Sequence, residues 1–80
     1  MIPLGMVAPG ARVKVVAIHG GGRVRKRLGD LGVTPGTELQ IVQSGGRGPI
    51  LLAFKDDARL ALGRGISLKI QVEPLDAESE

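Results

Sequence analysis

The chain has 80 residues and a formal net charge of +3, with one Phe and no Trp, Tyr or Cys. A chain of this length forms one small domain that buries about 60% of the surface its unfolded form exposes, so a core of Val, Ile and Leu leaves no room for an interior active-site cavity. The lack of cysteine excludes disulfides and thiolate metal sites and is compatible with a reducing cytoplasm. No apolar run approaches the roughly 20 residues of a membrane span, and the first residues lack the basic leader of a signal peptide. We therefore expect a cytoplasmic protein.

A similar sequence motif occurs at the start of each of the first two predicted strands. "LGMVAPGARVKVV" spans Leu4–Val16 and "LGVTPGTELQIV" spans Leu31–Val42, and both contain Leu-Gly, then Pro-Gly, then a strand-like run. Proline sets φ for the first central position of a type II turn, and glycine supplies the positive φ of the second. The two Pro-Gly pairs therefore predict two strand entrances of similar construction.

Between these strands the apolar residues follow a helical period. Val24, Leu28 and Leu31 lie at i, i+4 and i+7, a spacing that places them on one helical face. Gly32 stands where a left-handed residue ends many helices. We therefore predict a short helix over Arg23–Leu31 that covers one end of the folded domain.

Three glycines and a basic cluster open this helix. Gly20, Gly21 and Gly22 are expected to let the chain turn sharply from strand to helix. No Ser, Thr, Asp or Asn precedes the helix as a cap, and its N-terminus already carries about half a positive charge. A solvated helix face is the plainer interpretation of each single cation, but together they form a candidate docking patch for an acidic protein surface, lipid headgroups or nucleic acid. The cations are Arg23, Lys26 and Arg27 on the outward side and Arg25 on a separate flank.

Short alternating segments predict the rest of the fold. The last of them places Leu68, Ile70 and Val72 on the inward face, and Asp56–Asp57 suits a tight hairpin. Short strands separated by Gly and Pro favour an all-β fold, a small barrel of about five antiparallel strands, with the short helix inserted between strands one and two. We expect residues 1–75 to form this single domain and 76–80 to form a flexible acidic tail. The strand segments are Ala11–Ile18, Thr37–Val42, Ile50–Lys55, Ala58–Leu62 and Ser67–Glu73.

The glycine-rich basic segment does not have the sequence of a nucleotide site. "GGGRVRKRL" contains neither Gly-Lys-Ser/Thr nor Gly-x-Gly-x-x-Gly, which phosphate loops and dinucleotide folds require. "VAPGARVKVVAIHGG" resembles a KOW motif of nucleic-acid-binding proteins. However, small barrels that bind single strands stack bases on aromatic side chains, each worth about 1–3 kcal/mol, and Phe54 is expected in the core. Weak, salt-sensitive phosphate contacts would remain, so we expect no strong nucleic-acid binding and keep a KOW-like module as the alternative.

Catalysis and metal binding have little support in the residues. His19 is the single histidine, and no nucleophile–base pair occurs. We therefore expect no enzyme activity, no cofactor and no strong metal site, with weak capture of a divalent ion at His19 as the most the chain offers.

The central segment, "GGGRVRKRLGDLGVTPGTELQIV", resembles the signature of the FeoA family, small accessory proteins of ferrous iron transport. The flanking segments resemble the opening strand and the three closing strands of that family. One segment departs from the family, because "GRGIS" replaces a polar, helix-compatible stretch and predicts a looser, turn-like segment at Gly63–Ser67. The signature falls on Gly21, Gly22, Arg25, Arg27, Leu28, Leu31, Gly32, Val33, Pro35, Gly36, Leu39 and Ile41.

This resemblance implies an SH3-like barrel and a cytosolic partner of FeoB, the GTPase-linked membrane permease for Fe(II). It therefore implies that the protein assists Fe(II) transport at the inner face of the membrane and has no transmembrane segment of its own. A related barrel also forms the C-terminal domain of iron-dependent repressors, which keeps a regulatory role as a further alternative.

Overall fold

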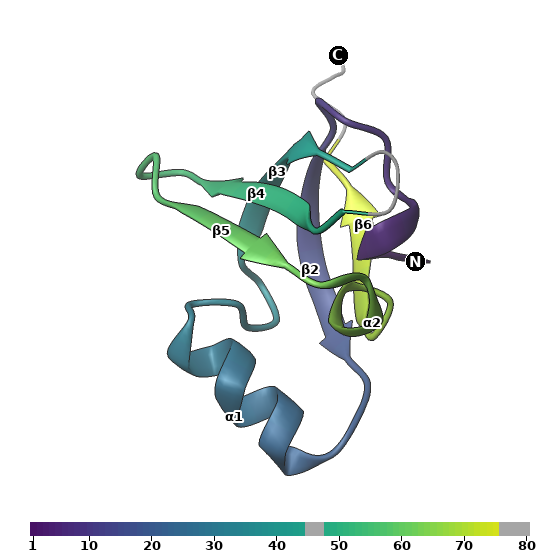
Figure 1. Ribbon diagram of the computed structural model, residues 1–80, viewed down its shortest axis with the longest axis vertical. Coiled ribbons are helices and arrows are strands. Elements are labelled where there is room, and N and C mark those ends of the chain that lie inside the picture. Colours follow the sequence, from purple (N-terminus) through teal and green to yellow (C-terminus); the bar gives the residue numbers. More distant parts are fainter. Residues whose placement is uncertain (45–47, 76–80) are drawn as a thin grey trace.

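The computed structural model describes residues 1–44 and 48–75. Its strands form one side of the molecule and α1 lies apart from them, at one end of a body that measures 38 × 26 × 24 Å (Figure 1). The expected acidic tail, 76–80, lies outside the described residues. In chain order the elements are β1 (Ile2–Pro3), a 3-10 turn η1 (Leu4–Met6), β2 (Arg12–Ile18), α1 (Gly22–Asp30), β3 (Glu38–Gln43), β4 (Ile50–Phe54), β5 (Arg59–Leu62), α2 (Arg64–Ser67) and β6 (Ile70–Pro74).

The strands form one antiparallel sheet in the order β1-β6-β2-β3-β4-β5. The five predicted strands are all present, and the sheet gains a sixth, β1, that the sequence did not indicate. β1 pairs Ile2 with Val72 and Pro3 with Gln71 of β6. Two residues are too few to show an alternation, so only the long-range pairing reveals this strand.

The two Pro-Gly turns hold β2 and β3 together reciprocally. Gly10 has φ +90° and Gly36 has φ +97°, as the type II prediction requires. The Gly10 amide donates to the Ile41 carbonyl of β3 at 2.7 Å, and the Gly36 amide donates to the Val15 carbonyl of β2 at 2.8 Å. Each turn therefore ties the start of its own strand to the neighbouring strand.

The core is aliphatic, as the composition required. Phe54, which we expected in the core, packs against it only in part and is half-buried. Strands, η1 and the helical insertion all contribute to a single cluster. Its members are Leu4, Val7, Val13, Val15, Ile18, Leu28, Val33, Leu39, Ile41, Ile50, Leu52, Leu62, Ile70 and Val72.

The prediction of a strand beginning at Ser67 is wrong. A helical turn, α2, ends there, and β6 begins only at Ile70. The amides of Ser67 and Leu68 donate to the carbonyls of Gly63 and Arg64, and the Ser67 hydroxyl donates to the Arg64 carbonyl at 2.9 Å. These local hydrogen bonds favour a helical turn over the strand that the alternating sequence predicts. As a result, Leu68 is 50% exposed instead of facing inward. The "GRGIS" segment is correspondingly helical, where we expected a loose turn.

α1 matches its predicted range to within one residue at each end, but one of its predicted inward residues is wrong. The helix ends at Asp30, which leaves Leu31 beyond its last turn and 42% exposed. Val33 is fully buried in its place. The Gly32 and Val33 amides donate to the carbonyls of Gly29 and Leu28, the two bonds of a Schellman motif, in which the residue after the left-handed glycine packs back onto the helix.

The three glycines before α1 have different backbone roles. Gly20 has φ +122°, a conformation that side-chain-bearing residues rarely adopt. Gly21 is the N-cap with φ −77°, and Gly22 is the first helical residue. The sharp turn from β2 into α1 therefore depends on Gly20, and the other two positions do not need glycine for their φ.

Gly21→Asp is expected to raise the free energy of unfolding by about 0.5–1 kcal/mol. The cap now has no side-chain hydrogen bond, and a β-carbon at Gly21 would meet nothing within 4 Å. An aspartate there would accept from the amides of the first turn and offset the adjacent cations. Urea denaturation measures the change, with Gly21→Ala as the control. An equal gain in both variants would assign the effect to the unfolded chain instead of the cap.

Candidate docking surfaces

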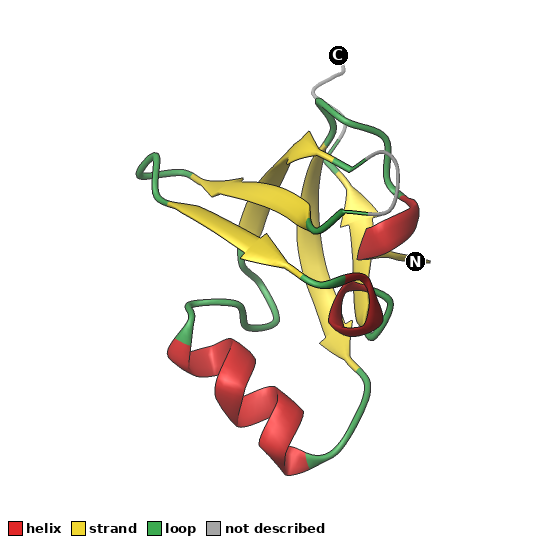
Figure 2. Cartoon of the chain, in the orientation of Figure 1, coloured by secondary structure: helices red, strands yellow, loops and turns green. Residues whose placement is uncertain are grey.

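The basic cluster lies on the exposed surface of α1. Arg23, Arg25, Lys26 and Arg27 are all exposed, whereas Leu28 is buried and Val24 half-buried. Among the residues that the structure describes, none of the four cations forms an ion pair with a carboxylate. Figure 2 shows α1 projecting from the strands on two connecting loops. The apolar side of α1 therefore attaches the helix to the core, and the cations remain exposed.

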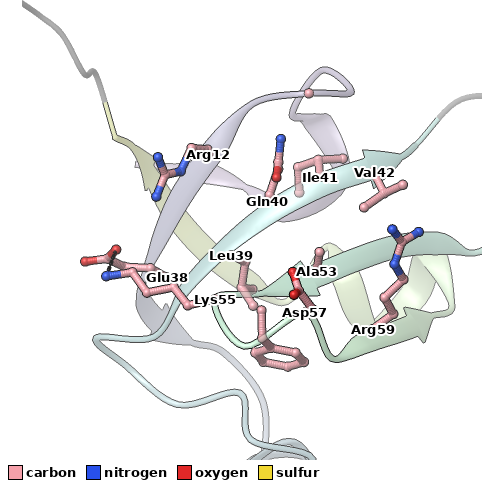
Figure 3. Close-up of a pocket in the computed structure, with 12 residues that line it drawn as sticks. Arg12, Glu38, Leu39, Gln40, Ile41, Val42, Ala53, Lys55, Asp57 and Arg59 are labelled. Carbon is pink, nitrogen blue, oxygen red and sulfur yellow. Dashed lines mark ion pairs between the residues drawn. The ribbon is translucent and has the colours of Figure 1, made fainter.

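A second surface is a hollow of about 640 Å³ on the outer face of the sheet (Figure 3). Arg12, Gln40, Ala53 and Arg59 lie in one row across β2 to β5, because these residues are paired in register. The small Ala53 leaves space in the middle, and the two arginines stand on opposite sides. Glu38, Lys55 and Asp57 also line it, so the hollow carries both charge signs and favours neither an anion nor a cation.

An ion pair at the edge of this hollow lowers the pKa of Glu38. Lys55 Nζ lies 2.8 Å from Glu38 Oε1, and the hydrogen bond from Lys55 is the largest cause, followed by its charge. A lowered pKa in the folded state stabilises the protein above the pKa of the unfolded chain, and this contribution is lost as pH falls through the folded value.

Lys55→Met is therefore expected to raise the pKa of Glu38 toward its ordinary value, measured by NMR titration of the Glu38 carboxyl carbon. Lys14→Met is the matched control, because Lys14 contributes the smallest of the lowering effects. An unchanged Glu38 titration in the Lys55 variant would show that the pair does not form in solution.

A third feature is a cleft of about 410 Å³ between β2 and the segment that follows α1. It is lined by Val16, Ala17 and Ile18 of β2 and by Val33, Thr34 and Pro35 of that segment. Arg25 also lines it. The arginine that the sequence placed on a separate flank of the helix is thus apart from the outer face and beside an apolar cleft.

Within residues 1–44 and 48–75, no three His, Asp or Glu side chains lie close enough together to hold a metal ion. His19 is exposed at the end of β2.

Comparison with known proteins identifies the family of this barrel. The model of the FeoA domain family matches residues 2–74. The chain belongs to the FeoA family. This FeoA domain is 35% identical over 78 residues to a Methanocaldococcus jannaschii protein provisionally named Fe(2+) transport protein A, an alignment that covers 98% of this chain and 90% of the relative. The resemblance found in the sequence is confirmed.

Solved structures place the fold of this FeoA domain. A crystal structure titled as an iron uptake regulatory protein (FeoA) is 35% identical with a TM-score of 0.84, covering 92% of this chain and 96% of that chain. The NMR structure of a FeoA-like protein from Clostridium acetobutylicum is 30% identical with a TM-score of 0.82, covering 99% of this chain and 92% of that one. The SH3-like fold prediction is confirmed.

One further structural relative shows the fold alone. A manganese-dependent transcriptional repressor is 20% identical with a TM-score of 0.84, and the match covers 91% of this chain but 36% of the repressor chain. A similar fold thus occurs in part of the chain of that repressor.

Sequence reasoning found the basic helix of this FeoA domain but missed both hollows. The row from Arg12 to Arg59 depends on the register of four strands, which no local pattern encodes. The cleft beside Arg25 does have a signal in the sequence, because β2 is apolar on both faces at Val15 and Val16. A strand with two apolar faces near a helical insertion indicates a second packing surface.

Proposed function

We propose that this FeoA domain is an accessory protein of ferrous iron uptake that docks onto the cytoplasmic part of a FeoB-type Fe(II) permease. The family supports a role in Fe(II) transport. The observation that carries the docking step is the exposed surface of α1, which carries four cations on a helix that is attached to the core by its apolar side.

The proposal assigns this domain no catalysis and no resident metal. Fe(II) is the cargo of the permease, and the FeoA domain acts through protein contact. None of the helices in the described part of the chain is long and apolar enough to cross a membrane, so we propose that it reaches the inner face of the membrane through its partner. Because the interface rim is cationic, the permease surface it meets is expected to be acidic.

The test is co-purification of the tagged chain with detergent-solubilised, full-length permease. We expect the two proteins to elute together at low ionic strength and to separate progressively as salt rises, since exposed charges are screened over about 8 Å at physiological ionic strength. Absence of any complex at low salt contradicts the proposal. Retention of cellular RNA by the chain in place of the permease would favour the KOW-like alternative.

A further inference from the structure

The cleft between β2 and the segment that follows α1, with Arg25 of α1 beside it, is lined mainly by apolar residues. β2 pairs with β6 on one side, and the register shifts between Val15 and Ala17, so Val16 is the extra residue of a β-bulge. Val15 is buried, whereas Val16 and Ala17 are half-buried. The bulge therefore interrupts the alternation and leaves apolar side chains on the side of β2 that lines the cleft.

The charge of the cleft differs from that of the other hollows. Arg25 is the one ionisable residue among those that line it, and no carboxylate does so. The hollow in Figure 3 contains Glu38 and Asp57 as well as cations. A third hollow, beside Leu31 and Phe54, contains Lys55 together with Glu38 and Asp56. The Arg25 cleft alone among these three combines an apolar lining with charge of a single sign.

This combination defines the chemistry of an occupant. A guanidinium binds a carboxylate through two parallel hydrogen bonds, and an apolar lining gains free energy by burying aliphatic side chains. Arg23, Lys26 and Arg27 on neighbouring turns add positive potential around the same helix. An occupant therefore needs acidic groups next to aliphatic side chains, which a protein segment offers.

We propose that this cleft binds a segment of the partner protein in which aliphatic side chains lie beside Asp or Glu. One carboxylate pairs with Arg25, and an adjacent aliphatic side chain fills the space over Val16 and Ala17. The inference rests on the proposed docking function and deepens it. The outer face of α1 attracts the acidic partner, and the cleft selects the segment that is held.

The experiment uses the intact chain and a synthetic probe. The probe is a blocked hexapeptide, Gly-Asp-Leu-Leu-Glu-Gly, and the controls replace its acids by Asn and Gln or its leucines by Ala. Amide NMR shifts locate the contact and give the affinity. We expect the largest shifts at Val16, Ala17 and Val33, and about tenfold weaker binding of each control peptide, as expected for loss of a charged hydrogen bond or of a buried side chain.

Variants separate the cleft from the outer face. Arg25→Gln should remove the preference for the acidic over the amide peptide, and Ala17→Phe should fill the cleft and abolish binding. Ala17→Met, a less bulky change, serves the same purpose if the Phe variant does not fold. Arg23→Gln is the matched control, because Arg23 lies on the outer side of the same helix, and it should leave peptide binding within about twofold in buffered physiological salt.

Other outcomes overturn the inference. Shifts confined to Arg23 and Arg27, or an unchanged acid preference in Arg25→Gln, would mean that the peptide does not use the cleft. Shifts at the cleft with phosphatidylglycerol vesicles, or on self-association without peptide, would assign it to lipid or to a second copy. Because the peptide experiment needs no permease, its failure is distinguishable from failure of the co-purification test.

Discussion

Leu28→Ala is expected to lower the free energy of unfolding by about 2–5 kcal/mol, the range for removing a fully buried leucine side chain. Leu28 is 1% exposed and is the one fully buried residue of α1. Its carbonyl also accepts a hydrogen bond from the Val33 amide at 2.8 Å, and the side chains of both residues belong to the core cluster. Urea denaturation of the two proteins measures the difference directly.

The size of this loss matters because small domains are stable by only about 5–15 kcal/mol. Leu31→Ala is the matched control, since it removes the same atoms from a leucine that is 42% exposed. We expect it to cost much less than Leu28→Ala. Equal losses would mean that the Leu31 side chain is also buried in solution. No loss from either change would show that the helix is not packed on the barrel.

The comparison of Leu28 with Leu31 shows what local patterns can and cannot predict. The helical period identified α1 correctly, because apolar residues at i, i+4 and i+7 lie on one face of a helix. It did not reveal where the helix stops packing, because the Schellman bonds reverse the chain at Gly32 and bring Val33 to the core. An apolar residue directly after a capping glycine is the sequence signal for this exchange.

The strands also divide into those that local sequence patterns predict and those that they do not. β3 and β4 could be predicted from alternation alone, and the two Pro-Gly turns predicted where β2 and β3 begin. β1 and α2 could not, because β1 exists through its pairing with β6 and α2 through hydrogen bonds within "GRGIS". The hollows are harder still to predict from the sequence, because each is lined by residues from several elements. The assignment of the basic helix to a partner stays a prediction.

Reversing Arg23, Lys26 and Arg27 to Glu is expected to weaken binding to the permease by about tenfold or more at low ionic strength. Interface-rim charges act mainly on the rate of encounter, and electrostatic steering changes association rates by about 10- to 1000-fold. The difference from the parent chain should shrink as salt rises, because the screening length falls from about 30 Å at 0.01 M to about 8 Å at 0.15 M. Binding measured across a salt series gives both quantities.

The fold should tolerate this triple change. All three side chains are exposed and none is in the core cluster. A glutamate at position 23 lies in the first turn and interacts favourably with the helix N-terminus, whereas one at position 27 lies in the last turn and interacts unfavourably with the C-terminus. The two effects offset each other, so the melting temperature is expected to stay nearly unchanged. Any loss of binding can then be assigned to the surface instead of to unfolding.

A second triple variant separates the local surface from total charge. Arg12, Lys14 and Arg59 are exposed cations on β2 and β5, and their reversal to Glu changes the net charge by the same amount. If α1 is the docking face, the helix variant weakens binding more than this control does at every ionic strength below the physiological one. Equal weakening would indicate attraction by net charge alone, and full binding by the helix variant would exclude α1 as the contact. Arg25 is intact in both triple variants, so the cleft beside β2 can still engage a partner that arrives more slowly.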